Sequence, residues 1–181
     1  MMPLAEYILP VKGLKIGMHH YNFDVDSDFF KHFEDSPITE GSFEVSLDFE
    51  KRHDMFDLRF RISGRASAAC DRCLGTIQLP VKGEFELVVK LSEEEIEEDI
   101  DIAFISPETS TLSVATWVYE YIVLSMPMRN VYDCESEAVR PCDMEMMERL
   151  EGIVLKHAPK DTDSSENPMW SKLRSEFEND N

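Results

Sequence analysis

The feature that most constrains the fold is a strict alternation of apolar and polar residues, which occurs three times between residues 43 and 91. The alternating apolar positions are Phe43, Val45, Leu47 and Phe49, then Phe56, Leu58, Phe60 and Ile62, and then Val81, Phe85, Leu87, Val89 and Leu91. A period of two is typical of strands with one buried and one solvated face. A polar tetrad at 51–54 separates the first two runs and predicts a hairpin. The region is therefore predicted to be an antiparallel meander that is either strongly curved or barrel-like.

The remaining segments predict short flanking elements and a helical C-terminal portion, so the expected fold class is α+β. Tyr7 to Met18 alternates like a strand, and Asp26 precedes aromatic residues as a helix cap does. Apolar residues at helical spacing predict helices at 114–122 and at 143–156. The expected organisation is a β region with a short helix at 1–91, an acidic loop at 92–110, a helical region packed on the sheet at 111–158, and a linker with an amphipathic helix at 159–181.

The charge of the chain disfavours broad, non-specific binding to nucleic acid. Eighteen Lys and Arg face 37 Asp and Glu, a formal net charge of −19 that repels a phosphate backbone. The two halves differ, because residues 1–91 carry a net charge of −4 and residues 92–181 a net charge of −15. We therefore expect any RNA contact in the first half, where six bases fall between residues 51 and 72, and a basic protein partner for the second.

The most chemically specific motif is Cys70-Asp71-Arg72-Cys73-Leu74-Gly75, which lies between two predicted strands. Two thiolates on a tight turn can bind one metal ion, and Cys134 and Cys142 could complete a four-sulfur zinc site, although their C-x7-C spacing is loose. Three interpretations stay open for Cys70 and Cys73: a structural zinc site, reduced thiols on a turn, and a redox dithiol. The redox interpretation is weakened because thioredoxin-like sites place C-x2-C at a helix N-terminus.

Other motifs of catalysis or targeting are missing from the sequence. There is no glycine-rich phosphate loop, no H-E-x-x-H and no G-x-S-x-G, so we expect no catalytic residue and no small-molecule substrate. The N-terminus does not have the pattern of a secretory signal, and the longest apolar segment, Trp117–Met128, is too short to cross a bilayer. We therefore expect a cytoplasmic protein that does not contact a membrane.

Several motifs follow one another in the order found in a known family. The C-x-R-C turn at Cys70–Cys73 comes after the alternating region, and Glu120, Ile122, Leu124 and Pro127 fit the pattern E-x-I-x-L-x-x-P. The segment 167–173 is similar to a D-P-R-W-x-x-L ending, with Asn for Asp and Met for Arg. On these motifs, from about residue 43 onward, the chain resembles the YceD family, also called the large ribosomal RNA subunit accumulation protein family.

The resemblance implies a non-enzymatic accessory factor in the synthesis, processing or stability of large-subunit ribosomal RNA, and it supplies no catalytic residues. The implied partners are ribosomal precursor components, either a basic ribosomal protein or ribosomal RNA. We expect the acidic half to contact the protein, and the RNA-binding residues to be Arg59, Arg61, Arg65 and Arg72. The alternatives are a cytosolic thiol oxidoreductase that uses Cys70 and Cys73, and a zinc-stabilised protein-interaction module.

Overall fold

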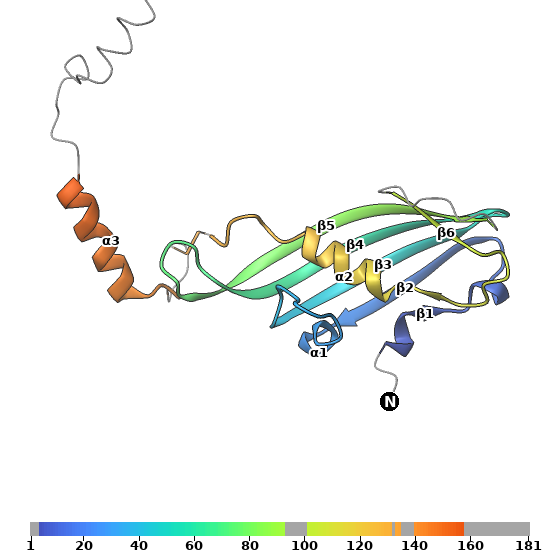
Figure 1. Ribbon diagram of the computed structural model, residues 1–181, viewed down its shortest axis with the longest axis horizontal. Helices are drawn as coiled ribbons and strands as arrows, with labels where there is room; N and C mark the ends of the chain where they lie inside the picture. Colours follow the sequence, from blue (N-terminus) through green and yellow to red (C-terminus); the bar gives the residue numbers. More distant parts are fainter. Residues whose placement is uncertain (1–3, 93–100, 132, 135–139, 158–181) are drawn as a thin grey trace, which may run out of the picture. The chain divides into compact units, whose positions relative to one another are not determined.

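The computed structural model describes residues 4–92, 101–131, 133–134 and 140–157 (Figure 1). The chain divides into two compact units, Met1–Pro141 and Cys142–Asn181, and each is described by itself. The first unit contains the sheet, and the described part of the second contains helix α3, Met144–His157. Asp143 caps α3 as predicted, because its Oδ1 accepts the backbone N–H of Met146 at 3.0 Å. The predicted linker and helix at 159–181 lie outside the described residues.

The first unit is a β structure with short helices, which confirms the predicted α+β class (Figure 1). Its strands are β1 (Ile8–Leu9), β2 (Gly17–Val25), β3 (Gly41–Lys51), β4 (Met55–Ala69), β5 (Thr76–Leu91), β6 (Ile102–Ile105) and β7 (Leu112–Ser113). Its helices are the 3-10 turns η1 (Ala5–Tyr7) and η2 (Val11–Gly13) and the α-helices α1 (Ser27–Phe30) and α2 (Ala115–Leu124).

The main sheet has five strands in the order β2-β3-β4-β5-β6. The pairs from β2 to β5 are antiparallel, as the alternation predicts, and β6 runs parallel to the end of β5. The barrel-like alternative is wrong, because the sheet is open, with β2 at one edge and β6 at the other. To close a barrel, the edge strands β2 and β6 would have to pair with each other, but they have nine and four residues. The short β6 pairs only with Val88–Leu91 of β5.

Two predicted segments differ from the structure. The span 92–110, predicted as an acidic loop, contains β6 at its centre; Ala103 is buried there beside Val89. The strand predicted from Tyr7 to Met18 is interrupted by η2, so that Ile8 and Leu9 pair with β7, while Gly17 and Met18 begin β2. Tertiary pairing with distant strands decided both segments, and the local pattern does not contain that information.

The core lies between the inner face of the sheet and α1, α2 and the β1–β7 pair. The alternating residues of β3 and β4 face inward and are buried, as the sequence predicts. Tyr121 of α2 stacks on Phe85 with ring centroids 4.5 Å apart and contacts Phe60, so α2 packs against β4 and β5. Gly83 makes this approach possible, because a Cβ atom there would lie 2.1 Å from Ser125 Oγ, just beyond the end of α2.

The β4–β5 hairpin extends beyond the rest of the sheet (Figure 1). The pairing of β3 with β4 stops at Gly41 and Ala66, whereas β4 and β5 remain paired as far as Ala69 and Thr76. On the other side, β6 pairs only with the last four residues of β5. The part of the hairpin nearest its turn is therefore a two-stranded ribbon with the cysteine motif at its tip.

Candidate functional site

The outer face of the sheet carries most of the charged side chains of the strands. Arg59, Arg61 and Arg65 of β4 alternate with less exposed residues and point outward, and for Arg59 and Arg61 this follows the period of two in the run 56–62. The antiparallel register places Glu86 opposite Arg59, Glu84 opposite Arg61 and Pro80 opposite Arg65. Carboxylates therefore face the first two arginines and not the third.

Arg59 and Arg61 are each ion-paired. Arg59 donates from Nε and Nη2 to Glu86 Oε1 at 2.8 and 2.6 Å, and its Nε lies 3.9 Å from Glu84 Oε1. Arg61 Nη2 donates to Asp48 Oδ2 of the neighbouring strand at 2.7 Å. Both arginine side chains remain about half exposed, at 52% and 46%. They are accessible, but each is neutralised by an acid of the same sheet.

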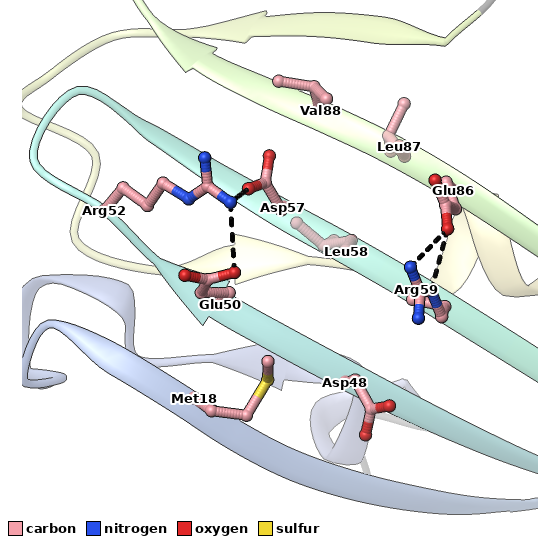
Figure 2. Close-up of a pocket in the computed structure, with 10 residues that line it drawn as sticks. All are labelled: Met18, Asp48, Glu50, Arg52, Asp57, Leu58, Arg59, Glu86, Leu87 and Val88. Atoms are coloured by element: carbon pink, nitrogen blue, oxygen red, sulfur yellow. Dashed lines mark hydrogen bonds and ion pairs between the residues drawn. The ribbon is translucent and has the colours of Figure 1, made fainter.

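A shallow hollow of about 510 Å³ surrounds these groups (Figure 2). Figure 2 shows Arg52 between Glu50 and Asp57, with Arg52 Nη2 at 3.2 and 2.6 Å from their carboxylate oxygens. Carboxylates outnumber cations in this part of the face. We call it the paired end, and it consists of Asp48, Glu50, Arg52, Asp57, Arg59, Arg61, Glu84 and Glu86.

The pKa values at the paired end reflect these contacts. The pKa of the Asp48 carboxyl is lowered, first by a hydrogen bond from His20 Nδ1 at 2.6 Å and then by the hydrogen bond from Arg61. The pKa of Arg52 is raised by its hydrogen bond to Glu50 and by the charge of Asp57. Each shift favours the charged form, so these groups are held as ions by one another.

The other half of the outer face is different, because its cations have no carboxylate partner among the described residues. Arg65, Lys82 and Arg72 are exposed, and none of them forms an ion pair with any residue that the structure describes. The register places Lys82 opposite Ser63, next to the pair of Arg65 and Pro80. We call the paired segments Ser63–Ala69 and Thr76–Lys82, with the turn that joins them, the cationic ribbon.

The tip of the cationic ribbon is a tight turn built around Cys70 and Cys73. Both thiols are buried, at 6% and 1% exposure, and the backbone N–H of Arg72 donates to Cys70 Sγ at 3.4 Å. The N–H of Leu74 donates to the Cys70 carbonyl at 2.8 Å, with Leu74 in the left-handed region at φ 60°. This geometry aims both sulfurs inward and leaves Arg72 on the surface.

The segment after α2 closes over this turn. Asp71 N–H donates to the Asn130 carbonyl at 3.1 Å, and Asn130 N–H donates to Asp71 Oδ2 at 2.7 Å. Within the described ranges, no group of three or more His, Cys, Asp or Glu side chains is arranged to hold a metal ion. Cys134 is half-buried in the first unit, and Cys142 begins the second. The four-cysteine zinc site stays a prediction.

Sequence reasoning missed Lys82. The signal was present, because Lys82 alternates with the apolar residues Val81 and Leu79 and therefore had to face outward. What was missing was the register that puts it on the same face as Arg65. The four predicted arginines divide into two couples: Arg59 and Arg61 are ion-paired, and Arg65 and Arg72 form no ion pair with any residue in the described ranges.

The comparison with family models decides the family of this chain. Residues 58–175 match the model described as YceD, large ribosomal RNA subunit accumulation protein YceD. The chain belongs to the YceD family. The resemblance stated from the C-x-R-C turn and the motif around Glu120 is thereby confirmed. No curated protein and no solved structure matches the chain.

The YceD match begins inside β4 and includes the whole cationic ribbon and α2. Three acids and one base of the paired end, Asp48, Glu50, Asp57 and Arg52, precede the first matched residue. Among the described helices, none is long and apolar enough to span a membrane.

Proposed function

We propose that this protein supports the accumulation of large-subunit ribosomal RNA by binding to ribosomal precursor components in the cytoplasm, without performing a chemical step. The observation that carries the proposal is the match to the YceD family over residues 58–175. The architecture supports it: an open sheet with an exposed, charged outer face provides a surface for macromolecules. Its hollows are shallow and polar, which suits a macromolecular partner better than a small substrate.

A cellular experiment tests this function. Deleting the gene in its host should lower the ratio of large-subunit to small-subunit ribosomal RNA, and re-expression of the chain should restore it. Affinity purification from native lysate, with and without nuclease, should recover ribosomal precursors with the protein. An unchanged rRNA ratio in the deletion strain would contradict the proposal.

The thiol oxidoreductase alternative is weaker because of where its cysteines lie. A dithiol that attacks a disulfide needs an accessible thiolate, and both Cys70 and Cys73 are buried. They also lie on a turn between antiparallel strands and not at a helix N-terminus. Substitution of both cysteines by serine should leave the reduction of a model disulfide unchanged, and a loss of turnover would revive this alternative.

A further inference from the structure

The cations predicted to contact RNA are unequal in the folded protein, since Arg59 and Arg61 bind carboxylates, whereas Arg65 and Arg72 bind no carboxylate of the part of the chain that the structure describes. We propose that RNA backbone phosphates bind to the outer face of the cationic ribbon through Arg65, Lys82 and Arg72, and not through the arginines of the paired end. The inference rests on the proposed function and deepens it, because it names the ligand and the surface that binds it.

The three side chains lie on one hairpin. Arg65 is opposite Pro80, and Lys82 is two residues along β5 on the same face, so Arg65 and Lys82 are diagonal neighbours about 7–8 Å apart. Arg72 is exposed on the turn that joins β4 to β5. The β4–β5 hairpin therefore presents all three cations, with Ser42 of β3 paired to Arg65 on its other side.

The ribbon is more basic than the chain as a whole. Residues 58–83 contain five Lys or Arg and one acid, Asp71, in a chain where acids outnumber bases two to one. The Oδ2 atom of Asp71 accepts the backbone N–H of Asn130 at 2.7 Å. The other outward residues of the ribbon strands are neutral: Ser63, Ser67, Ala69, Thr76, Gln78 and Pro80.

Two acids flank the cationic ribbon: Glu84 is two residues from Lys82 on the outer face of β5, and Glu44 of β3 is opposite Ser63. The other acids of the strands are more distant, and Asp57 is eight residues from Arg65 on β4, about 26 Å at the rise of an antiparallel strand. The screening length at physiological ionic strength is about 8 Å, so exposed charges at that separation interact weakly. A phosphate at the ribbon therefore experiences Arg65, Lys82 and Arg72 together with these two acids, and none of the three cations forms an ion pair with a described residue.

The two kinds of arginine differ in what a phosphate meets when it binds. At Arg59 or Arg61, a phosphate must either displace a carboxylate bound at 2.6 or 2.7 Å or bind beside that carboxylate, and both arrangements bring two anions close together. Arg65 has no such partner among the described residues. Binding at Arg65 replaces only water, so the same ligand binds more tightly there.

Hydrogen-bond donors surround Arg65 as well. It lines a shallow groove of about 570 Å³ with a second cation, Lys31, whose Nζ is paired with Asp28 at 2.5 Å, and with one carboxylate, Glu40. The other groove residues are Ser27, Thr39, Gly41, Ser42, Ser67 and Gln78. Hydroxyl and amide groups with an arginine are the usual partners of phosphate oxygens.

The composition of this surface also indicates which part of RNA it contacts. None of the outward residues of the ribbon strands is aromatic, so these strands offer no platform on which a base can stack. Contacts to the backbone position a nucleic acid without reading its sequence. We therefore expect binding that depends strongly on salt and weakly on base sequence.

The experiment measures RNA binding by two matched sets of variants of the full chain. The first replaces Arg65, Lys82 and Arg72 by Gln, and the second replaces Arg59 and Arg61 by Gln. The dissociation constant is measured between 50 and 300 mM salt with a transcript of a large-subunit rRNA domain and with poly(U). All five side chains are exposed, and circular dichroism checks that each variant is folded.

The ribbon variant should bind the transcript at least about tenfold more weakly at low salt, with a salt slope smaller by about 2 to 3, since each phosphate contact contributes about 0.7 to 0.9 to that slope. The paired-end variant should keep the wild-type slope. The inference is overturned if the ribbon variant binds as the wild type does, if the paired-end variant alone loses binding, or if the wild-type chain binds neither RNA. Equal loss in both variants also overturns it.

The test separates this inference from the proposed function. The ribbon variant is also expressed in the deletion strain, and the ratio of ribosomal RNAs is measured. If the wild-type chain and the ribbon variant both restore the ratio, this result contradicts the inference but not the proposed function. A deletion that does not change the ratio removes the function, whatever the RNA-binding result.

Discussion

The paired end and the cationic ribbon share the strands β4 and β5 and yet differ in how their cations are paired. At the paired end, Arg52 contacts two carboxylates and Arg61 contacts a third, so charge is balanced within the sheet. At the ribbon, Arg65 and Lys82 face serine and proline. The difference shows that outward-facing arginines of one strand are equivalent in the sequence pattern but not as binding groups, because the partner strand decides which are neutralised.

The largest expected effect comes from breaking the pairing of β3 with β4, on which the paired end depends. Gly64 lies opposite Phe43, and a Cβ atom there would approach the Ser42 carbonyl oxygen to 2.4 Å and Phe43 Cα to 2.7 Å. Because these are backbone atoms, the strands must separate, and we expect Gly64→Ala to lower the free energy of unfolding by about 3 kcal/mol. Urea denaturation measures the change.

Gly13→Ala is the matched control for Gly64→Ala. No atom lies within 4 Å of a Cβ built at Gly13, so its effect should stay within about 0.5 kcal/mol. Equal stability of the two variants would show that the close approach of β3 and β4 at Gly64 does not constrain the sheet.

The next effect is at the tip of the ribbon. Replacing Cys70 and Cys73 by Ser puts two hydroxyls into buried positions, and we expect the free energy of unfolding to fall by about 1–3 kcal/mol. The double substitution should not affect the ion pairs of the paired end, so the dependence of the melting temperature on salt should stay as in the wild type and serves as an internal control. Unchanged stability would mean that the turn does not depend on its thiols.

Zinc content, measured on the same two proteins, tests the four-cysteine prediction separately. A site made by Cys70, Cys73, Cys134 and Cys142 should give about one zinc per wild-type chain, and the double variant should lose it. Wild-type protein without zinc, and with the same melting temperature after chelation, would contradict the zinc site.

A smaller effect compares the two kinds of arginine directly. Arg59→Gln removes the ion pair with Glu86 and leaves the Glu86 carboxylate near that of Glu84. We therefore expect the free energy of unfolding to fall by about 0.5 kcal/mol, the usual size for an exposed ion pair. Arg65→Gln should change stability less, because no described carboxylate loses a partner. In thermal denaturation, the melting temperatures of the two variants should differ at low salt, and this difference should disappear at 1 M salt.

The smallest effect is the pH dependence of the paired end. His20 and Arg61 lower the pKa of Asp48, so its ionised form stabilises the folded state at pH values above its ordinary pKa, and this contribution is lost as the pH falls through the lowered value. The melting temperatures of wild type and Asp48→Asn should therefore differ at pH 7 and converge below about pH 4. A difference that does not change with pH would assign the effect to packing.

Much of this fold could be predicted from local patterns. The alternation at 43–49, 56–62 and 81–91 identified the three central strands and their buried faces, and helical spacing identified α2. The strand predicted from Tyr7 contains β1, but the short strands β6 and β7 could not be predicted, because a strand of two to four residues has too little pattern and exists only through its partner. The open edges of the sheet likewise depend on which strands meet.

The features of the candidate site can also be separated into those that local patterns predict and those that depend on strand pairing. By itself, the sequence determined that Arg59, Arg61, Arg65 and Lys82 face solvent, because side chains on a strand alternate between its two faces. Only the tertiary structure decided that Glu86 and Asp48 neutralise the first two, while Arg65 and Lys82 form no ion pair with a described residue, because strand pairing joins residues that are distant in the chain, such as Arg59 and Glu86, 27 positions apart. Local composition contains the charges, and the pairing of strands determines which of them can bind a partner.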